Sequence, residues 1–344
     1  MNAEAKVEKK IKLSKKKEFD VQFDDRTPLW QRIKARFFTM TFVKDLAWAI
    51  FRYVLLVGIA YVVLYPFIAK IAGSFMSKED FLDVSVKLIP KYPTLDTYKA
   101  IITENRYFEA LWNSTVISLL CAIVQMVVTM VVGYGFAKFK FKGNTILFYC
   151  VVFTMVVPHQ ALRLALYQTF RNFDLFGIIS LLNKGKALNL INTYWPLALL
   201  SFGGLAFKNG LYIFMMRQFF RGVPDELEEA AYVDGSGVFK TFIRIIVPLS
   251  VPMMITVFLF AFSWQWTDDF YTTMFFTRTS NYLLPNITAN IPSSLDAVGF
   301  DAAAVYQSAI INTGALLIIL PLLILYCFCQ RYLIQGIERS GIVG

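Results

Sequence analysis

The stretch PDELEEAAYVDGSGVFKTFIRIIVPLSVP, residues 224–252, decides how the rest of the sequence is interpreted. Pro224 suits the first turn of a helix, and the acidic residues that follow it favour the positive end of the helix dipole. Gly235 and Gly237 then interrupt this helix, and Pro248 bends or restarts the chain where a long apolar segment begins. The stretch therefore predicts a short polar helix, a glycine turn and the entry into an apolar helix.

The sequence on both sides of this stretch has the composition of a membrane protein. Of its 344 residues, 57% are hydrophobic and 17% are charged, whereas a soluble domain is about 45–50% apolar and about 25% charged. About 20 consecutive apolar residues span a bilayer as a helix, and the absence of alternation excludes a β-barrel. We therefore expect an all-α polytopic membrane protein. Its six expected transmembrane helices are 46–69, 115–137, 145–167, 195–216, 245–266 and 308–330.

The distribution of basic residues predicts the orientation, because cytoplasmic loops carry an excess of Lys and Arg. The excess is found before the first span, between the second and third, between the fourth and fifth, and after the last. These four regions share one side of a six-helix arrangement, so both termini are expected in the cytoplasm. The net charge of +10 reflects this bias, and no nucleic-acid-binding module accompanies it.

The first 45 residues are expected to form a region of their own. Residues 1–45 have the composition of a solvated basic cytoplasmic tail. Its last part fits either an interfacial helix on the inner leaflet or a simple basic flank of the first span. Residues 46–344 form the transmembrane domain, in which the polar loop covers about 222–246.

The polar loop also contains a recognisable motif. EAAYVDGSGVFKTFIRIIVP, residues 229–248, resembles the EAA loop of ABC-importer permeases in its Glu-Ala-Ala, glycine and proline positions. Three other stretches resemble the carbohydrate-type branch, to which the smaller maltose permease subunit belongs. They are GYGFAKFKFKG at 133–143, WQWTDDF at 264–270 and QRYLIQGIERSGIVG at 330–344.

The resemblance implies a permease of a binding-protein-dependent ABC importer in the bacterial inner or plasma membrane. Such a permease moves a sugar or oligosaccharide into the cytoplasm by ATP-driven alternating access. Its implied partners are a second, homologous permease, two ABC ATPases and an extracytoplasmic solute-binding protein. This chain has no phosphate-binding Gly-rich loop with Lys-Ser/Thr, so ATP and Mg are expected on the ATPases and the chain is not expected to be an enzyme.

The resemblance also assigns a role to the polar helix, which becomes a coupling helix that fits a groove on the ATPase. In the family, the Glu at the position of Glu229 meets a basic residue of that groove, and the Gly at Gly235 permits the turn. The residues expected to make up the coupling site are Glu228, Glu229, Ala230, Ala231, Asp234 and Gly235. From spacing alone, we expect Leu227, Ala230 and Ala231 to share one face of the helix, with the acids on the other.

Polar and aromatic residues at membrane depth are candidates for the translocation path, because they are costly in a bilayer. Sugars are bound by aromatic faces together with amide or carboxylate hydrogen bonds. Structural roles compete, since Trp anchors membrane interfaces and Gln or Asn bonds neighbouring helices. The resemblance also places the sugar site mainly in the other, larger permease. The candidates are Gln125, Lys208, Asn209, Trp264, Trp266, Asp268 and Asn312.

Other function classes fit the sequence less well. An ion-coupled secondary transporter would show repeated halves and an acidic pair at mid-membrane, which the sequence lacks. A metal-dependent membrane enzyme would need more than the Asp268–Asp269 pair, and the only histidine, His159, is expected in a loop or at the interface. The four cysteines lie in expected spans as small apolar residues, not as a metal site. Within the ABC class, a polyol phosphate or a modified peptide is the alternative substrate.

Overall fold

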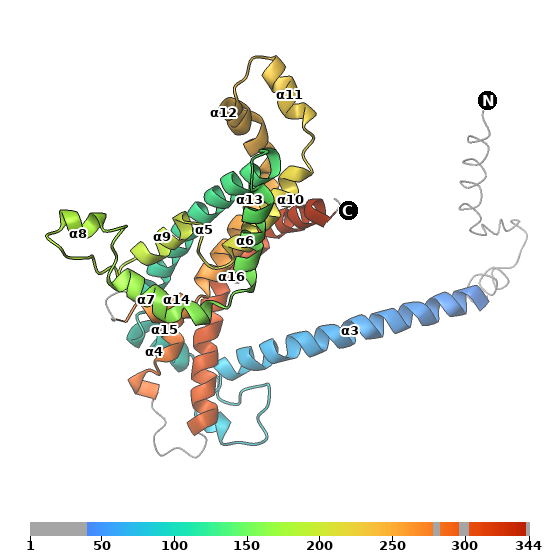
Figure 1. The fold of residues 1–344 in the computed structure, drawn as a ribbon. Coiled ribbons are helices and arrows are strands. Elements are labelled where there is room, and N and C mark those ends of the chain that lie inside the picture. The colour runs from blue at the N-terminus through green and yellow to red at the C-terminus, as the bar shows by residue number, and fades with distance from the viewer. Residues whose placement is uncertain (1–39, 278–282, 296–302, 342–344) are drawn as a thin grey trace, which may run out of the picture. The chain divides into compact units, whose positions relative to one another are not determined.

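The computed structural model describes residues 40–277, 283–295 and 303–341, and these are arranged as helices and connections (Figure 1). Within these ranges the β pairing amounts to one isolated bridge, between Phe173 and Leu188. The expected basic tail and interfacial helix lie outside the described residues, except for the last few positions before 46. The all-α fold expected from the composition is therefore confirmed for the described part of the chain.

The chain divides into two compact units, residues 1–68 and residues 69–344. The first contains most of α3 (Met40–Ser74), which includes the whole of the expected span 46–69. Its length and hydropathy are sufficient to cross a membrane. The other helices of the described residues belong to the second unit.

Three further helical runs are long and apolar enough to span a bilayer. They are α5 (Tyr107–Lys138), the continuous run Val238–Trp266, and α16 (Ala303–Gly341), which with α3 give four spans among the described residues. The expected span 145–167 is a bent pair. In it, α6 (Asn144–Val156) is followed by η2 (His159–Leu162) and α7 (Arg163–Arg171) at an angle of 94°, which gives a fifth span if the pair is counted as one.

The expected span 195–216 is two helices instead of one. The first, α9 (Trp195–Phe202), and the second, α10 (Asn209–Arg221), are separated by the connection 203–208. Gly204 (φ +70°) and Lys208 (φ +65°) both adopt the left-handed conformation there, and this conformation ends a regular helix. Six continuous spans are thus not found among the described residues.

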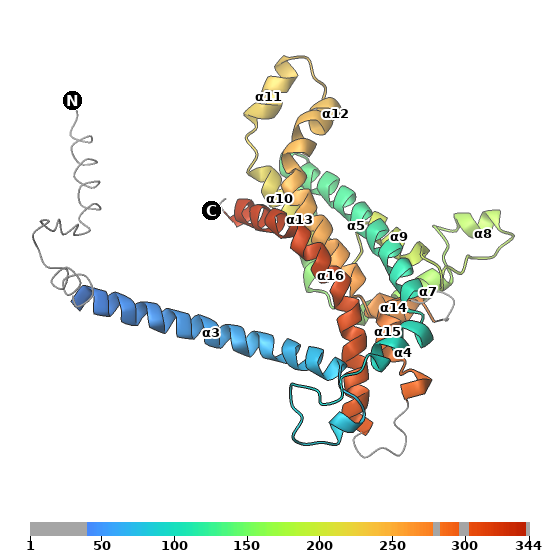
Figure 2. The ribbon, with the colours of Figure 1, turned by 180° about the vertical axis from the view of Figure 1, so that it is seen from behind.

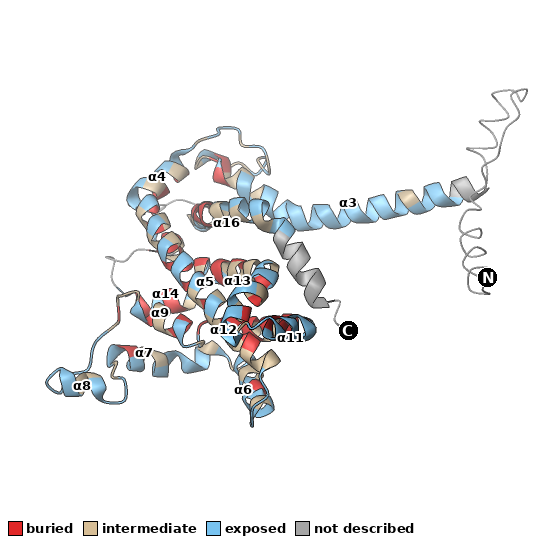
Figure 3. Cartoon of the chain, turned by 90° about the horizontal axis from the view of Figure 1, so that it is seen from above, coloured by how far each residue is buried: buried red, intermediate tan, exposed pale blue. Residues whose placement is uncertain are grey.

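Within the second unit, α5 packs along α10 and α13 (Val247–Trp266), and α13 packs in turn along α16 (Figures 1 and 2). Gly133 permits the close approach of α5 and α10, because a Cβ there would lie 2.6 Å from the Cβ of Met216. The indole Nε1 of Trp266 donates to the Ile318 carbonyl at 2.9 Å and ties α13 to α16. Buried positions gather on α5, α13 and α14 (Phe270–Phe275), whereas α8 (Ile178–Leu182) is largely exposed (Figure 3).

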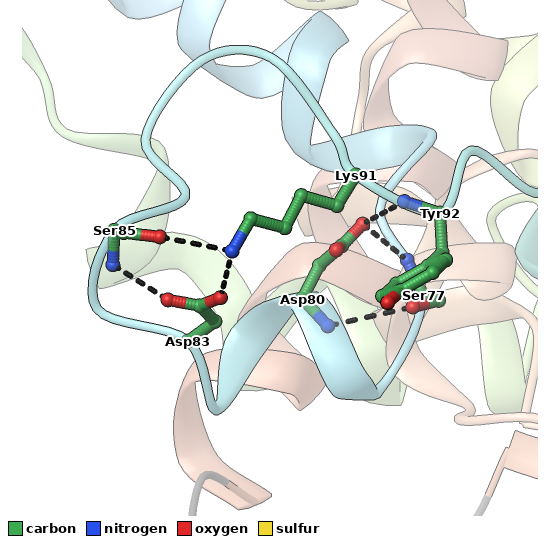
Figure 4. Close-up of polar contacts among 6 residues, drawn as sticks. All are labelled: Ser77, Asp80, Asp83, Ser85, Lys91 and Tyr92. Carbon is green, nitrogen blue, oxygen red and sulfur yellow. Dashed lines mark hydrogen bonds and ion pairs between the residues drawn. The ribbon is translucent and has the colours of Figure 1, made fainter.

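One end of the unit is built from short elements. The connection after α3 holds η1 (Glu79–Phe81) and leads to α4 (Asp96–Glu104), while α15 (Pro285–Ala289) and η4 (Ser293–Leu295) precede α16. The carboxylate of buried Asp80 accepts from the backbone N–H of Ser77 and Tyr92, and Lys91 binds Asp83 nearby (Figure 4). Side-chain hydrogen bonds of this kind order a connection that has little regular structure.

At the other end, α11 (Glu226–Val233) and α12 (Val238–Thr241) form a hairpin beyond the ends of α5, α10 and α13 (Figures 1 and 2). The chain continues from α12 through a π-helical segment, η3 (Phe242–Ile246), into α13. Pro248 explains the π segment, since a proline has no N–H to donate to the carbonyl four residues earlier. The proline therefore changes the hydrogen-bond register without ending the helix.

Candidate functional site

The short helix and glycine turn expected from residues 224–252 are present as α11 and the connection that follows it. Glu226, Glu228 and Glu229 occupy the first turn of α11, where acidic side chains favour the helix dipole. Gly235 has a φ of +78°; its N–H donates to the Tyr232 carbonyl at 3.0 Å, and that of Ser236 donates to the Ala231 carbonyl at 2.9 Å. These two bonds and the left-handed glycine make a Schellman motif, which fixes the direction of the chain after α11.

The faces of α11 differ from the expected ones. Glu228 and Ala231 point inward and are buried, at 7% exposure each. Leu227 and Ala230 are exposed together with Glu229, and Glu228 shares the buried side with Ala231, so the expected separation of an apolar face from the acids was wrong. The spacing gave the correct helix but not its rotation, because a buried ion pair, not the alanines, decides which side faces the protein.

That ion pair belongs to a cluster that we call the Lys138 clamp, formed by Tyr134 and Lys138 of α5 with Asp225 and Glu228 of the hairpin. The ammonium of Lys138 lies 2.5 Å from Asp225 Oδ1 and 3.6 Å from Glu228 Oε1, and it donates to the Val223 carbonyl at 2.6 Å. The hydroxyl of Tyr134 donates to Glu228 Oε2 at 3.0 Å.

Burial makes the Lys138 clamp a strong constraint. The side chains of Lys138 and Glu228 are only 7% and 10% exposed, so each charge depends on the other for compensation. Asp225 is exposed, and the adjacent Lys138 ammonium holds the pKa of its carboxyl below the usual range. The clamp therefore fastens the start of α11 to the end of α5.

The coupling residues expected from the motif are divided by the structure into two groups. Glu229, Ala230, Asp234 and Gly235 are exposed and accessible to another protein, whereas Glu228 and Ala231 face the interior. Sequence reasoning missed Tyr134 and Lys138 as members of this site. Their signal was the motif at 133–143, which was used for the orientation and for the resemblance to the carbohydrate-type branch but not for the coupling site.

A second polar cluster lies where α9 and α10 are interrupted. A cavity of about 620 Å³ is bounded there by the bend between α6 and η2 and by the start of α10, and this volume is in the range of small-molecule sites, about 300–1,000 Å³. Its wall includes His159, Lys208, Asn209 and Tyr271. Within the described part of the chain, no group of three or more His, Cys, Asp or Glu residues could hold a metal ion.

The polar groups of this cavity are held in distinct ways. The ammonium of Lys208 lies 5.0 Å from the ring centre of Phe207 and 4.9 Å from that of Trp264. Asn209 is 1% exposed, and neither its amide nitrogen nor its oxygen has a hydrogen-bond partner among the described residues. His159 is half-buried, and its Nδ1 lies 3.1 Å from the Tyr271 hydroxyl.

The structure brings together three of the residues expected along a translocation path, Lys208, Asn209 and Trp264. Two others hold the fold, since Trp266 bonds α16 and the Asp268 carboxylate accepts from the N–H groups of Tyr271 and Thr272 at the start of α14. The amide of Gln125 donates to the Ser201 hydroxyl at 3.4 Å and links α5 to α9. Asn312 is half-buried in α16 and does not line the cavity. His159 does line it, although the sequence suggested only a loop or interface position.

Comparisons with known proteins agree with one another. The profile of a family described as binding-protein-dependent transport system inner membrane component matches residues 111–339. The galactooligosaccharides transport system permease protein GanQ of Bacillus subtilis is 26% identical, over 86% of this chain and 95% of its own length. The maltodextrin transport system permease protein MalD of Streptococcus pneumoniae is 26% identical, over 84% of this chain and 93% of its own length.

A solved structure has the same fold. It is the crystal structure of a bacterial ABC transporter involved in the import of the acidic polysaccharide alginate, one chain of which aligns with a TM-score of 0.63. The alignment covers 84% of the present chain and 97% of that chain, at 18% sequence identity. At this identity the similarity establishes a common fold.

Proposed function

Because the chain belongs to the family of binding-protein-dependent transport system inner membrane components, we propose that it is the permease subunit of an ABC importer for a sugar or oligosaccharide. Two relatives whose names specify galactooligosaccharide and maltodextrin transport align with it over more than four fifths of its length. The proposed activity is ATP-driven alternating access, in which the cavity side and the hairpin side of the molecule open in turn.

The observation that carries the proposal is the exposed hairpin of α11 and α12. Leu227, Glu229 and Ala230 offer a small apolar surface with one free carboxylate, which suits a groove lined with a basic residue. The Lys138 clamp and the Schellman motif at Gly235 hold this surface rigidly. A rigid element of this kind is suited to transmit a push from a partner ATPase.

The contacts of the hairpin indicate how a displacement of α11 would be transmitted to the other helices. A displacement of α11 reaches α10 and α12 through the chain itself, and it reaches α5 through the Lys138 clamp. Three membrane-crossing segments would then move as one body. ATP and Mg would bind to the two ATPases, while a second permease and an extracytoplasmic solute-binding protein complete the proposed assembly.

The proposed topology has six crossings, with α9 and α10 together forming a broken fourth one. Both termini and the α11–α12 hairpin are then cytoplasmic, in agreement with the bias of Lys and Arg. Cysteines introduced at Lys142 and Ser236 should react with a membrane-impermeant reagent only from the cytoplasmic side. Labelling of either site from outside would contradict this orientation.

The broken helix also gives some support to another class, because ion-coupled transporters often use interrupted helices at mid-membrane. The family match and the exposed hairpin favour the ABC class, in which a non-sugar solute remains the alternative substrate. Partner dependence separates the two classes. An ABC permease transports only in the presence of its ATPases, whereas a secondary transporter works alone.

The test is to purify the tagged chain from its host and to measure co-purifying ATPase together with ATP-dependent sugar uptake. We expect Glu229→Lys and Gly235→Pro to reduce both about tenfold or more, while membrane insertion is unchanged. Asp96→Lys, an equal charge change at an exposed position of α4, serves as the control. Normal assembly and uptake in both hairpin variants, or uptake by the chain without any ATPase, would contradict the proposal.

A further inference from the structure

The start of α10 concentrates hydrogen-bond donors. The N-cap position is occupied by Lys208, whose side chain can donate but cannot accept, so the first turn has no side-chain cap. The N–H groups of Gly210 and Leu211 have no acceptor among the described residues. Because a helix N-terminus carries partial positive charge, this end of α10 favours an anionic acceptor.

Asn209 gives an independent indication of a ligand. Its side chain lines the cavity and is 1% exposed, yet both of its polar atoms lack partners in the described part of the chain. Buried amides are almost always hydrogen-bonded, because an unpaired one loses its bonds to water without replacement. Because both atoms are covered in the unliganded structure, a ligand in the cavity would supply the missing partner once the side chain turns toward it.

The charge of the cavity has one sign. Lys208 is the one fully charged residue in the described wall, which includes no Asp or Glu. Its ammonium faces the rings of Phe207 and Trp264 and forms no ion pair with a described residue. Its φ of +65° is uncommon for a residue with a side chain, and such conformations cluster at ligand-binding sites.

We propose that this cavity binds the carboxylate of an acidic saccharide, so that the transported sugar contains a uronic acid unit. This inference rests on the proposed function as a sugar importer. The carboxylate would pair with the Lys208 ammonium and accept from the Asn209 amide and the first turn of α10. The ring of Phe207 in the cavity wall offers an apolar face on which a sugar ring can stack.

A neutral sugar would use this site less well. Its hydroxyl groups could bond Asn209, but they would leave the Lys208 charge uncompensated in surroundings of low dielectric constant. The phosphate of a phospholipid headgroup has the same anionic chemistry as a uronate. The experiment must therefore separate these two sources of negative charge.

The test uses the complete transporter, with its ATPases and binding protein, in nanodiscs. The probes are di- and trisaccharides of galacturonate, glucuronate, mannuronate and guluronate, each compared with the neutral saccharide of the same linkage. We expect at least one uronate to bind about tenfold or more tightly than its neutral counterpart. Lys208→Met should abolish this preference and Lys208→Arg should retain it, while Lys186→Met, the same change on an exposed lysine, should have no effect.

A second variant covers the case in which Lys208→Met does not fold. Asn209→Leu keeps the charge and removes the unpaired amide, and it should weaken uronate binding several-fold. The inference is overturned if no uronate is preferred, or if the preference survives Lys208→Met. If no uronate is preferred and mass spectrometry finds a phospholipid that is lost in Lys208→Met, the anion bound at this site is a lipid headgroup and the inference is overturned.

ATP-driven uptake by the same complex reconstituted in proteoliposomes distinguishes this inference from the proposed function. ATP-driven uptake of neutral saccharides without any preference for uronates would leave the sugar importer intact and remove only the acidic-ligand site. Absence of ATP-driven uptake for every acidic and neutral saccharide tested would contradict the proposed function itself. Uptake that is specific for uronates and depends on Lys208 supports both.

Discussion

The Lys138 clamp and the cavity at the start of α10 contain similar polar groups, but they satisfy them in opposite ways. In the clamp, the Lys138 ammonium meets two carboxylates and a backbone carbonyl supplied by the same chain. In the cavity, Lys208 faces aromatic rings and Asn209 has no partner among the described residues. The first arrangement compensates its charges within the chain, although Glu228 Oε1 has the ion pair with Lys138 and no hydrogen bond among the described residues, whereas the second has no compensating charge.

This difference indicates which region of the fold is rigid and which region is able to bind a ligand. Burial of a paired charge fixes the geometry, while an unpaired polar group raises the energy of the unliganded state and lowers the cost of binding a ligand. The two regions are joined by α10, which begins at the cavity and ends next to the clamp. At about 1.5 Å per residue, this helix separates them by roughly 20 Å.

The largest expected effect comes from removing the clamp lysine. In Lys138→Met, the Glu228 carboxylate remains buried without its counter-charge, and this type of change costs about 3–5 kcal/mol. We expect a clear decrease in the Tm of the purified protein and a loss of ATP-coupled uptake. The control is Lys140→Met, an exposed lysine two residues further along, which should change the Tm little.

A double-mutant cycle decides whether the loss is due to the pair. Lys138→Met combined with Glu228→Leu removes both charges, so its destabilisation should be smaller than the sum of the single effects. Strictly additive effects would mean that the clamp is not an interacting pair. The buried charges of Lys138 and Glu228 would then not compensate each other.

The next expected effect concerns the packing of α5 against α10 near the Lys138 clamp. A Cβ on Gly133 would lie 2.6 Å from the Cβ of Met216 and 3.0 Å from the backbone nitrogen of Arg217, so Gly133→Ala must push α5 and α10 apart. Overpacking of this kind costs about 1–3 kcal/mol. Gly135→Ala is the matched control, because no atom lies within 4 Å of its added Cβ. Equal melting temperatures for the two variants would show that close approach of α5 and α10 is not required.

A smaller change of opposite sign is expected in the cavity. In Asn209→Leu, an apolar side chain of similar size replaces an amide that has no partner among the described residues. Relief of this desolvation should raise the stability of the unliganded protein by about 1 kcal/mol. A rise in Tm together with weaker transport would sharpen the contrast with the clamp. A fall in Tm would show that Asn209 is already satisfied in the unliganded protein.

The sequence predicted the elements better than their orientation. Long apolar runs predicted α3, α5, α13 and α16, because hydrophobic length is a local property of the chain. The interruption at 203–208 was missed, although Gly203 and Gly204 lie within it. Lys208 adopts a left-handed conformation there, and its ammonium lies against Trp264 of α13, which no local pattern indicates.

In the candidate sites, too, features that depend on neighbouring residues were predicted, and features that depend on distant residues were not. The motif at 229–248 predicted the helix and the turn at Gly235, since both depend on neighbouring residues. The rotation of α11 depends on Lys138, about 90 positions earlier, and so could not be obtained from periodicity. Likewise, His159 and Tyr271 meet across a long stretch of sequence, and only the folded chain shows that they share a cavity wall.

The smallest expected effect tests whether any ion pair would behave as the clamp does. Asp83 and Lys91 also pair, but their side chains are 39% and 52% exposed (Figure 4). Hydrogen bonds from Lys91 and Ser85 hold the pKa of Asp83 below its usual range. The contribution of the pair is therefore present above the unfolded pKa, about 4, and is lost as the pH falls below it.

Asp83→Asn should consequently leave the Tm at pH 7 nearly unchanged, because solvent screens exposed pairs. Faster hydrogen exchange at the amide of Ser85 is expected in this variant, since that amide donates to the carboxylate of Asp83. In the wild type, the same protection should weaken only below about pH 4. A large decrease in Tm at neutral pH would mean that exposed pairs stabilise this protein as much as buried ones. Burial would then not be what distinguishes the Lys138 clamp, and its rigidity would need another cause.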